Sequence, residues 1–322
     1  MGKQLEHAVR ASNTFGHSKR ADKFNDAVNT DWKVYSDKYT DDLVNLGLDF
    51  GRFLTKEFPH IRNSFEIGPK EIEAFLEKKS FTCAQDTLKT QLSRLWKIEK
   101  CCMRISCSKN KKKFNWDTSN VTVPESKKDA KYRKNKPIPL DVAKVAIADL
   151  KEKDSEAGNA VAVSAYAGTR VEESSCLKVE NVHFSGGEFN LGWINIIEGP
   201  EGGAKNGKER FIPILNKEYQ DVFKALVAGK KPGDYIAAKE GGGKLSTARI
   251  SDALKKVLKA RHGDTYLYNG CHAMRKTFAQ LYYDITRKNH TRKETISKTN
   301  LVIGHGKNRG EQGIDRYVAN RH

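Results

Sequence analysis

The sequence predicts a mostly α-helical chain of two domains: an N-terminal all-α domain, and a C-terminal α+β domain that adds a small antiparallel β-sheet to its helices. Two observations predict this fold class. Apolar residues recur at helical spacing through most of the chain. One segment departs from that spacing, where GWINIIE and ERFIPI flank the turn GPEGGAKNGK in the pattern of a β-hairpin. A length of 322 residues is enough for two domains.

The charge balance indicates a polyanionic partner. Lys and Arg number 58 against 40 Asp and Glu, a net charge of +18. An excess of this size favours nucleic acid, although a basic protein without such a partner stays the simpler alternative. No window has the roughly 18 apolar residues of a membrane span, and the N-terminus lacks the apolar core of a secretory signal. We therefore expect a cytoplasmic protein.

The N-terminal domain is predicted to consist of three amphipathic helices in residues 29–108. The first ends before Pro59, because proline interrupts a helix. The second begins near Pro69, which suits a first helical position, and the third contains TLKTQLSRLWKIEK. Residues 1–28 are polar and basic with little periodicity, so we expect a basic N-terminal extension that is mobile or ordered only on DNA.

A basic interdomain linker is predicted over residues 109–136. The stretch 105–136 breaks the helical pattern, and its ten Lys and Arg against three acidic residues give it a net charge of +7. Such a run is often only a solvated tail. Because it joins two folded segments, we expect it to contact the phosphates of a duplex, through Lys111, Lys112, Lys113, Lys131, Arg133 and Lys134.

The C-terminal domain is predicted over residues 137–322. One helix begins near Leu140, and an apolar helical run then ends at Gly168. Two or three strands are expected between residues 188 and 214, with helices from there to the end. The hairpin turn also matches a phosphate-binding loop, GxxxxGK, but Glu209 follows where that loop needs Ser or Thr, so we reject nucleotide binding.

The strongest chemical signal begins at residue 271. CHAMRKTFAQLYYDI is predicted to form a helix with one apolar stripe, and His272 and Arg275 lie three residues apart at the edge of that stripe. Alone, such a pair is more often a chance occurrence on a surface helix. Other segments (AGTRVEES, the hairpin turn, LVIGHG and RYV) extend the set, and the candidates in chain order are Arg170, Lys205, His272, Arg275, His305 and Tyr317.

This order resembles the active site of the tyrosine recombinase (phage integrase) family: an Arg, a hairpin Lys, HxxR, a His or Trp, and a Tyr. The similarity runs from residue 140 to the end and rests on four separated boxes that agree in order and spacing. It implies that residues 29–108 are a core-binding DNA domain and residues 137–322 a catalytic domain. It also implies a site-specific DNA recombinase that works through a Holliday junction.

The resemblance assigns the bond-making steps to three residues. Tyr317 is the nucleophile and forms a 3′-phosphotyrosine. His272 accepts the phenolic proton, and Lys205 protonates the leaving 5′ oxygen. Because the phosphotyrosine conserves the energy of the phosphodiester bond, no metal or cofactor is expected.

Four further residues support the reacting phosphate in the same resemblance. Arg170 and Arg275 stabilise the charge of the pentacoordinate transition state. His305 donates a hydrogen bond to a phosphate oxygen, and Glu173 orients Arg170. Taken alone, each of these residues could be an ordinary surface or turn residue. The catalytic interpretation rests on their occurrence together.

The resemblance also implies partners and a setting. We expect double-stranded DNA with specific attachment sites, a monomer in the free state and a homotetramer on paired sites, with accessory DNA-bending or directionality factors as further candidates. A nucleoid-associated protein of a prokaryote, phage or mobile element is implied. Two alternatives stay open: a type IB topoisomerase that religates the same strand, and a DNA-binding protein that no longer cleaves.

The segment that carries Tyr317 leads to a separate expectation. It contains Gly306, Gly310 and Gly313, and little chain follows the tyrosine. Because glycine loses the most conformational entropy on ordering, we expect Tyr317 to be poorly positioned until DNA is bound.

Overall fold

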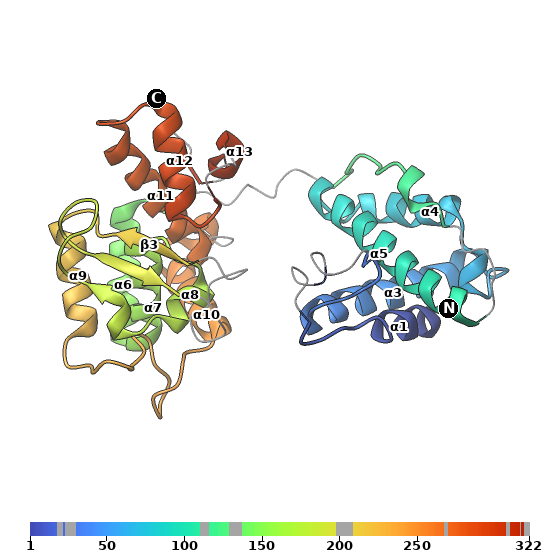
Figure 1. Cartoon of the computed structure of the whole chain (residues 1–322), viewed down its shortest axis with the longest axis horizontal. Coiled ribbons are helices and arrows are strands. Elements are labelled where there is room, and N and C mark those ends of the chain that lie inside the picture. Colours follow the sequence, from blue (N-terminus) through green and yellow to red (C-terminus); the bar gives the residue numbers. More distant parts are fainter. Residues whose placement is uncertain are drawn as a thin grey trace. The chain divides into compact units, whose positions relative to one another are not determined.

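We describe a computed structural model of the chain that covers residues 1–17, 22, 30–109, 116–128, 137–197, 209–266, 270–306, 310–315 and 317–318. The chain divides into two compact units, residues 1–132 and 133–322 (Figure 1). Each unit is considered by itself.

The N-terminal unit is all-α, as predicted. Its three predicted helices are α3 (Asp37–Glu57), α4 (Pro69–Ser80) and α5 (Gln85–Lys109), with the 3₁₀ turns η1 (Ser64–Glu66) and η2 (Thr118–Asn120) beside them. Pro69 occupies the first position of α4, as expected. The Ser36 side chain accepts a hydrogen bond from the Tyr39 amide and caps α3.

A fourth helix, α1 (Gly2–Arg10), corrects the prediction of an N-terminal extension. Its Leu5, Ala8 and Val9 are buried, and it packs closely along α3. The approach is close because α3 has glycine at the crossing: a Cβ on Gly51 would lie 2.4 Å from the Gly2 backbone. The expectation that residues 1–28 are mobile is therefore wrong for residues 2–10, whose short apolar pattern Leu5, Ala8, Val9 is helical.

The predicted linker of residues 109–136 is also corrected in part. Residues 116–128 fold onto the N-terminal unit and do not extend away from it. Trp116 is fully buried and donates from its indole nitrogen to the Ser64 carbonyl at 2.8 Å, and Thr118 donates to the buried Glu99 carboxylate at 2.6 Å. Burying the indole removes a large apolar area from water, and this favours docking of the segment over a solvated linker despite the basic residues around it. The six basic residues predicted to contact DNA lie outside the described residues.

The C-terminal unit begins with three helices, α6 (Leu140–Lys153), α7 (Ser155–Ala167) and α8 (Val171–Cys176). A 3₁₀ turn, η3 (Val179–Asn181), leads to the strands β1 (Val182–His183), β2 (Trp193–Ile196) and β3 (Arg210–Pro213). The remaining elements are α9 (Lys217–Val227), α10 (Thr247–His262), η5 (Gly263–Tyr266), α11 (Cys271–Arg287), α12 (Arg292–Val302) and α13 (Gly310–Ile314).

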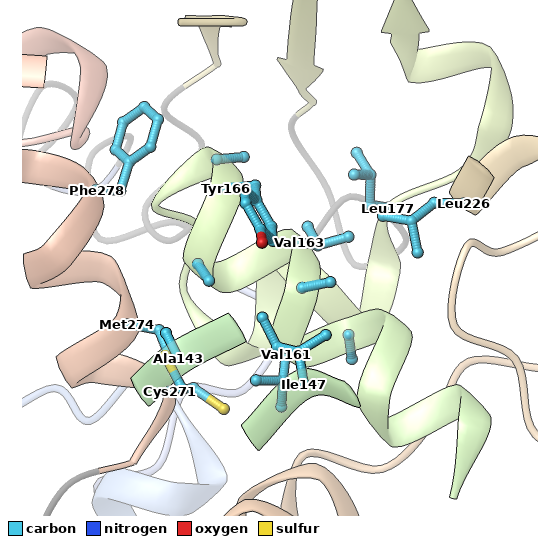
Figure 2. Packing of buried hydrophobic residues seen from close by; sticks show 14 of the residues in the cluster. Ala143, Ile147, Val161, Val163, Tyr166, Leu177, Leu226, Cys271, Met274 and Phe278 are labelled. Carbon is cyan, nitrogen blue, oxygen red and sulfur yellow. The ribbon is translucent and has the colours of Figure 1, made fainter. Parts of the chain in front are cut away.

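Helix α7 lies at the centre of this unit. From Ala160 to Ala167 its residues are all buried, as expected for a helix that is covered on every side. Figure 2 shows Val161, Val163 and Tyr166 on this helix beside side chains from α6 and α11, among them Ile147 and Phe278. The helix ends at Gly168, which has the left-handed backbone (φ 59°) that closes many helices.

The strands form one antiparallel sheet in the order β1-β2-β3, so the predicted fold class is confirmed. Trp193 pairs with Pro213 and Ile196 with Arg210, and the second pair is the last one before the hairpin turn. Ile194, Ile196 and Ile212 point into the core, whereas Phe211 is exposed. This alternation follows from the pleat of a strand.

The last three helices enclose a smaller apolar cluster of their own, at the C-terminal end of the unit (red in Figure 1). Its members come from α11, α12, α13 and the segment after α13: Ala279, Tyr283, Ile296, Ile303, Ile314, Tyr317 and Val318. In the described parts of both units, no helix combines the length and apolar character needed to cross a bilayer.

Candidate active site

Arg170 is held at the start of α8 by Glu173, three residues further on. The Arg170 backbone amide donates to Glu173 Oε2 at 2.7 Å, and its guanidinium Nη1 donates to Glu173 Oε1 at 2.6 Å. The spacing explains both bonds, because the third residue of a helix can reach back to the residue that caps it. The Arg170 side chain keeps 20% of its surface exposed, so it can still meet a ligand.

Glu173 itself is completely buried among three arginines. Arg210 contributes Nη1 at 2.9 Å from Oε1 and Nη2 at 2.6 Å from Oε2, and Arg275 Nη1 lies 3.7 Å from Oε2. Burial by itself would raise the pKa of this carboxyl, but the Arg210 hydrogen bonds and the charges of the three arginines outweigh it. The pKa of Glu173 falls to about 2.

Arg275 projects from α11 into the interior, and none of its surface is exposed. Its two Nη atoms donate to the carbonyls of Gly168 and Ile303, which joins the end of α7 to the end of α12. Its Nε has no acceptor within the described part of the chain. Burial and the nearby charge of Arg170 lower the pKa of Arg275 to about 10, so it stays a cation at neutral pH.

The Tyr317 ring lies against three of the predicted residues. Its centroid is 5.1 Å from that of His272 and 4.9 Å from that of His305, and Arg275 Cζ lies 5.5 Å from it. Tyr317 is 8% exposed. The expectation of a poorly positioned tyrosine is therefore not met in this structure, because Ile314 and Val318 pack beside it and hold the segment.

His305 is fixed by the turn that follows α12. Its amide donates to the Asn300 carbonyl at 2.7 Å, and its ring Nδ1 lies 2.7 Å from the Gly313 carbonyl oxygen. Because a carbonyl oxygen can only accept, Nδ1 must carry the proton in this contact. The Asn300 side chain also donates to the Gly310 carbonyl at 2.8 Å, so one residue connects the turn to α13.

His272 lies at the start of α11 with part of its ring exposed. Burial of the remainder, together with the charges of Arg275, Lys276 and Arg170, lowers the pKa of His272 to about 4. Its imidazole is therefore neutral at pH 7, which is the form that can accept a proton.

The structure thus brings together five of the six residues proposed for chemistry, and Glu173 with them. The sixth, Lys205, lies in the hairpin turn outside the described residues. His272 is at the surface, as its position at the edge of the stripe suggests. Arg275, expected at the same edge, is buried.

One residue of this cluster escaped the sequence analysis. Arg210 served there only as part of the hairpin pattern. The alternation along β3 could have shown that Arg210 is buried, because it shares a face of the strand with the buried Ile212, opposite to the exposed Phe211. A charged residue on a buried face needs a partner, and here the partner is Glu173.

Comparison with known proteins places this arrangement in a family. Residues 140–285 match the model of the phage integrase family. This segment contains Arg170, Glu173, His272 and Arg275, and it ends before His305 and Tyr317. A search of curated proteins returns no match.

Several solved structures share the fold over nearly the whole chain. The Tn1549 transposon integrase in complex with circular intermediate DNA superposes with a TM-score of 0.57 at 13% identity, over 99% of this chain and 95% of that one. A lambda integrase dimer bound to a core site gives 0.57 at 14% identity, over 98% and 77%. A lambda integrase tetramer bound to a Holliday junction gives 0.58 at 14% identity, over 95% and 78%.

The family match, the fold and the order of the clustered residues agree with one another: residues 140–285 carry a domain of the phage integrase family, the tyrosine recombinases.

Proposed function

We propose that this protein is a site-specific DNA recombinase that cuts and rejoins strands through a 3′-phosphotyrosine. The observation that carries the proposal is the convergence of His272, His305 and Arg275 around the ring of Tyr317. A phosphodiester resists nucleophiles because it is negatively charged. A tyrosine beside two imidazoles and a cluster of arginines has the groups that such a reaction needs.

The strand transfer divides into balanced steps. The Tyr317 oxygen bonds to phosphorus while the bond from phosphorus to the 5′ oxygen breaks. His272, neutral at pH 7, takes the phenolic proton. Lys205 gives a proton to the 5′ oxygen as it leaves. The 5′ hydroxyl of a second duplex then attacks the phosphotyrosine and reverses the step, so strands are exchanged without hydrolysis.

The arginines have unequal roles in this scheme. Arg170 keeps exposed surface and can meet a non-bridging oxygen directly. Arg275 is closed to solvent in the arrangement described here, with the Tyr317 ring over it. We expect bound DNA to shift that ring, so that the phosphate takes its place against Arg275 and the tyrosine oxygen faces phosphorus.

The partner in this proposal is double-stranded DNA, and the active assembly is a tetramer on two sites. The Tn1549 and lambda relatives are DNA complexes, one of them a tetramer on a Holliday junction. The net charge of +18 supports the same partner. Lys111, Lys112 and Lys113 are proposed to bind phosphates, and replacing them with Gln should reduce the slope of log K against log salt by about 0.9 for each phosphate that is no longer neutralised.

A trapped adduct tests the nucleophile. A nicked suicide substrate lets the cleaved fragment diffuse away, so the covalent complex accumulates and is seen on a denaturing gel. Tyr317→Phe should bind DNA normally and form no adduct. Tyr283→Phe is a matched control, since Tyr283 is another buried tyrosine of the same apolar cluster, and it should form the adduct. An adduct with Tyr317→Phe would refute the assignment.

A second substrate tests the general acid. A 5′-phosphorothiolate carries a sulfur leaving group that needs no proton, so it should rescue Lys205→Ala. Lys208→Ala in the same turn is the control and should be little affected on either substrate. Formation of a Holliday junction on paired sites separates a recombinase from an enzyme that only religates one strand.

A further inference from the structure

Arg210 lies where three parts of the active site meet. It is the first residue of β3 and pairs with Ile196 on β2, so it lies at the end of the strands from which the turn with Lys205 begins. Its side chain is only 6% exposed and points away from the sheet surface that Phe211 occupies. A buried guanidinium at this place requires acceptors from other elements.

Two elements supply those acceptors. Arg210 Nη1 and Nη2 donate to the two carboxylate oxygens of Glu173 at 2.9 and 2.6 Å. Its Nε donates to the Val302 carbonyl at the end of α12, at 2.8 Å. All three nitrogens of the guanidinium group are therefore engaged. The paired contact fixes the plane of the carboxylate as well as its position.

The same carboxylate holds Arg170. Glu173 Oε1 accepts from Arg170 Nη1 as well as from Arg210 Nη1, and Oε2 accepts from the Arg170 amide. With Arg210 on one side, both oxygens are presented to Arg170 in one orientation.

Arg210 also packs against the turn that precedes His305. Gly304 has a left-handed backbone (φ 65°), and a Cβ there would lie 3.1 Å from Arg210 Nη1 and 3.2 Å from its Cζ. This turn follows the Val302 carbonyl to which Arg210 donates, so the guanidinium contacts the chain on both sides of Ile303. The guanidinium thus contacts both Glu173 and the turn that leads into His305.

We propose that Arg210 is a positioning residue of the strand-transfer reaction: it acts through Glu173 to aim Arg170 at the scissile phosphate, and it connects that arrangement to the first residue of β3, where the turn with Lys205 ends. The inference rests on the proposed recombinase function. Lysine cannot replace it, because a single ammonium cannot hold both oxygens of Glu173 and the Val302 carbonyl in one plane.

The experiment compares two scissile groups with the variant Arg210→Lys. One suicide substrate has an ordinary phosphodiester, and the other has a methylphosphonate, which lacks the negative charge that Arg170 is placed to stabilise. With the phosphodiester, strand cleavage should be slower than wild type by on the order of 100-fold. With the methylphosphonate, the two proteins should differ by no more than roughly 5-fold, and Arg170→Ala should behave in the same way, since the need for Arg170 is removed.

Controls separate positioning from stability. Arg249→Lys is the matched control, because Arg249 makes a similar paired contact in the same unit, at 2.8 and 3.0 Å from the two carboxylate oxygens of Asp154. It should leave the cleavage rates on both substrates unchanged. Gly304→Ala keeps every charge but presses on the Arg210 guanidinium, and it should show the same substrate dependence as Arg210→Lys. Thermal unfolding and DNA binding of each variant establish that the protein is folded.

The outcomes are distinct. Equal slowing of Arg210→Lys on both substrates, with DNA binding intact, would overturn the positioning role, and so would a wild-type rate on the phosphodiester. Should Arg210→Lys fail to fold, the substrate dependence of Gly304→Ala decides in the same way. A wild-type protein that forms no adduct on the phosphodiester would instead contradict the recombinase function.

Discussion

Replacing Glu173 with Gln should destabilise the C-terminal unit by an amount that the structure allows us to work out. The carboxyl is fully buried, and its pKa falls from an ordinary value of 4.5 to about 2. That difference corresponds to about 3 kcal/mol of the free energy of unfolding at pH 7. Removing one partner of a buried ion pair costs on the order of 3–5 kcal/mol, which agrees. Gln would also turn an N–H group toward Arg210.

The sign of the pH dependence follows from the direction of the shift. The folded-state pKa lies below the unfolded one, so the stabilisation is complete above about pH 4.5 and is lost as the pH falls toward 2. The difference between wild type and Glu173→Gln should therefore shrink to about 1.5 kcal/mol near pH 3.

The measurement has to report on the C-terminal unit alone. Trp193 is the tryptophan of that unit, so urea unfolding followed by ¹⁹F NMR of 5-fluorotryptophan-labelled protein isolates its transition. Trp193→Phe assigns the resonance. Glu172→Gln is the control, since Glu172 is its exposed neighbour on α8, and it should change the stability by less than about 0.5 kcal/mol. A Glu173→Gln effect that stays constant from pH 7 to about pH 3 would refute the charge argument.

Three further predictions concern single residues. Trp116→Ala should lower the free energy of unfolding of the N-terminal unit, measured in urea, by about 3–5 kcal/mol. The substitution empties a fully buried site and leaves the Ser64 carbonyl without its donor. A loss below about 1 kcal/mol would mean that the segment is not docked. Gly168→Ala should cost at least about 2 kcal/mol in thermal unfolding, since a Cβ would lie 2.3 Å from the Phe278 ring on a left-handed backbone; an unchanged midpoint contradicts it. NMR of the histidine rings should show His272 titrating near pH 4. Because its folded-state pKa is lowered, the free energy of unfolding should fall as the pH drops from about 6.5 to 4. A titration midpoint near 6.5 would show that its ring is solvated.

Local pattern was sufficient for most elements. The helices α3, α4, α6, α7, α10 and α11 follow from apolar spacing and from punctuating residues such as Pro69 and Gly168. The hairpin follows from alternation around a glycine-rich turn. These features depend on residues close in sequence, whose periodicity is set by backbone geometry.

Local pattern misjudged the two ends of the N-terminal unit. Residues 2–10 have only a brief apolar stripe, and the surface that buries α1 comes from α3 and α5. Residues 116–128 fall within the predicted basic linker because basic runs flank them on both sides, although their own two lysines are balanced by Asp117 and Glu125. The indole of Trp116 packs beside the Phe50 ring, with ring centroids 5.9 Å apart, and this contact docks the segment. Packing between distant segments decided both cases.

The sequence by itself determined which residues are available for chemistry, since their order along the chain is what the resemblance to tyrosine recombinases rests on. Only the tertiary structure decided how they are connected. Arg210 and Glu173 are 37 positions apart, and Arg210 and Val302 are 92 apart. No periodicity links such residues, because a contact of this kind depends on how β3, α8 and α12 pack. The burial of Arg275 and the site of Tyr317 between two histidines have the same origin: they follow from the packing of α11, α12 and α13 on one another.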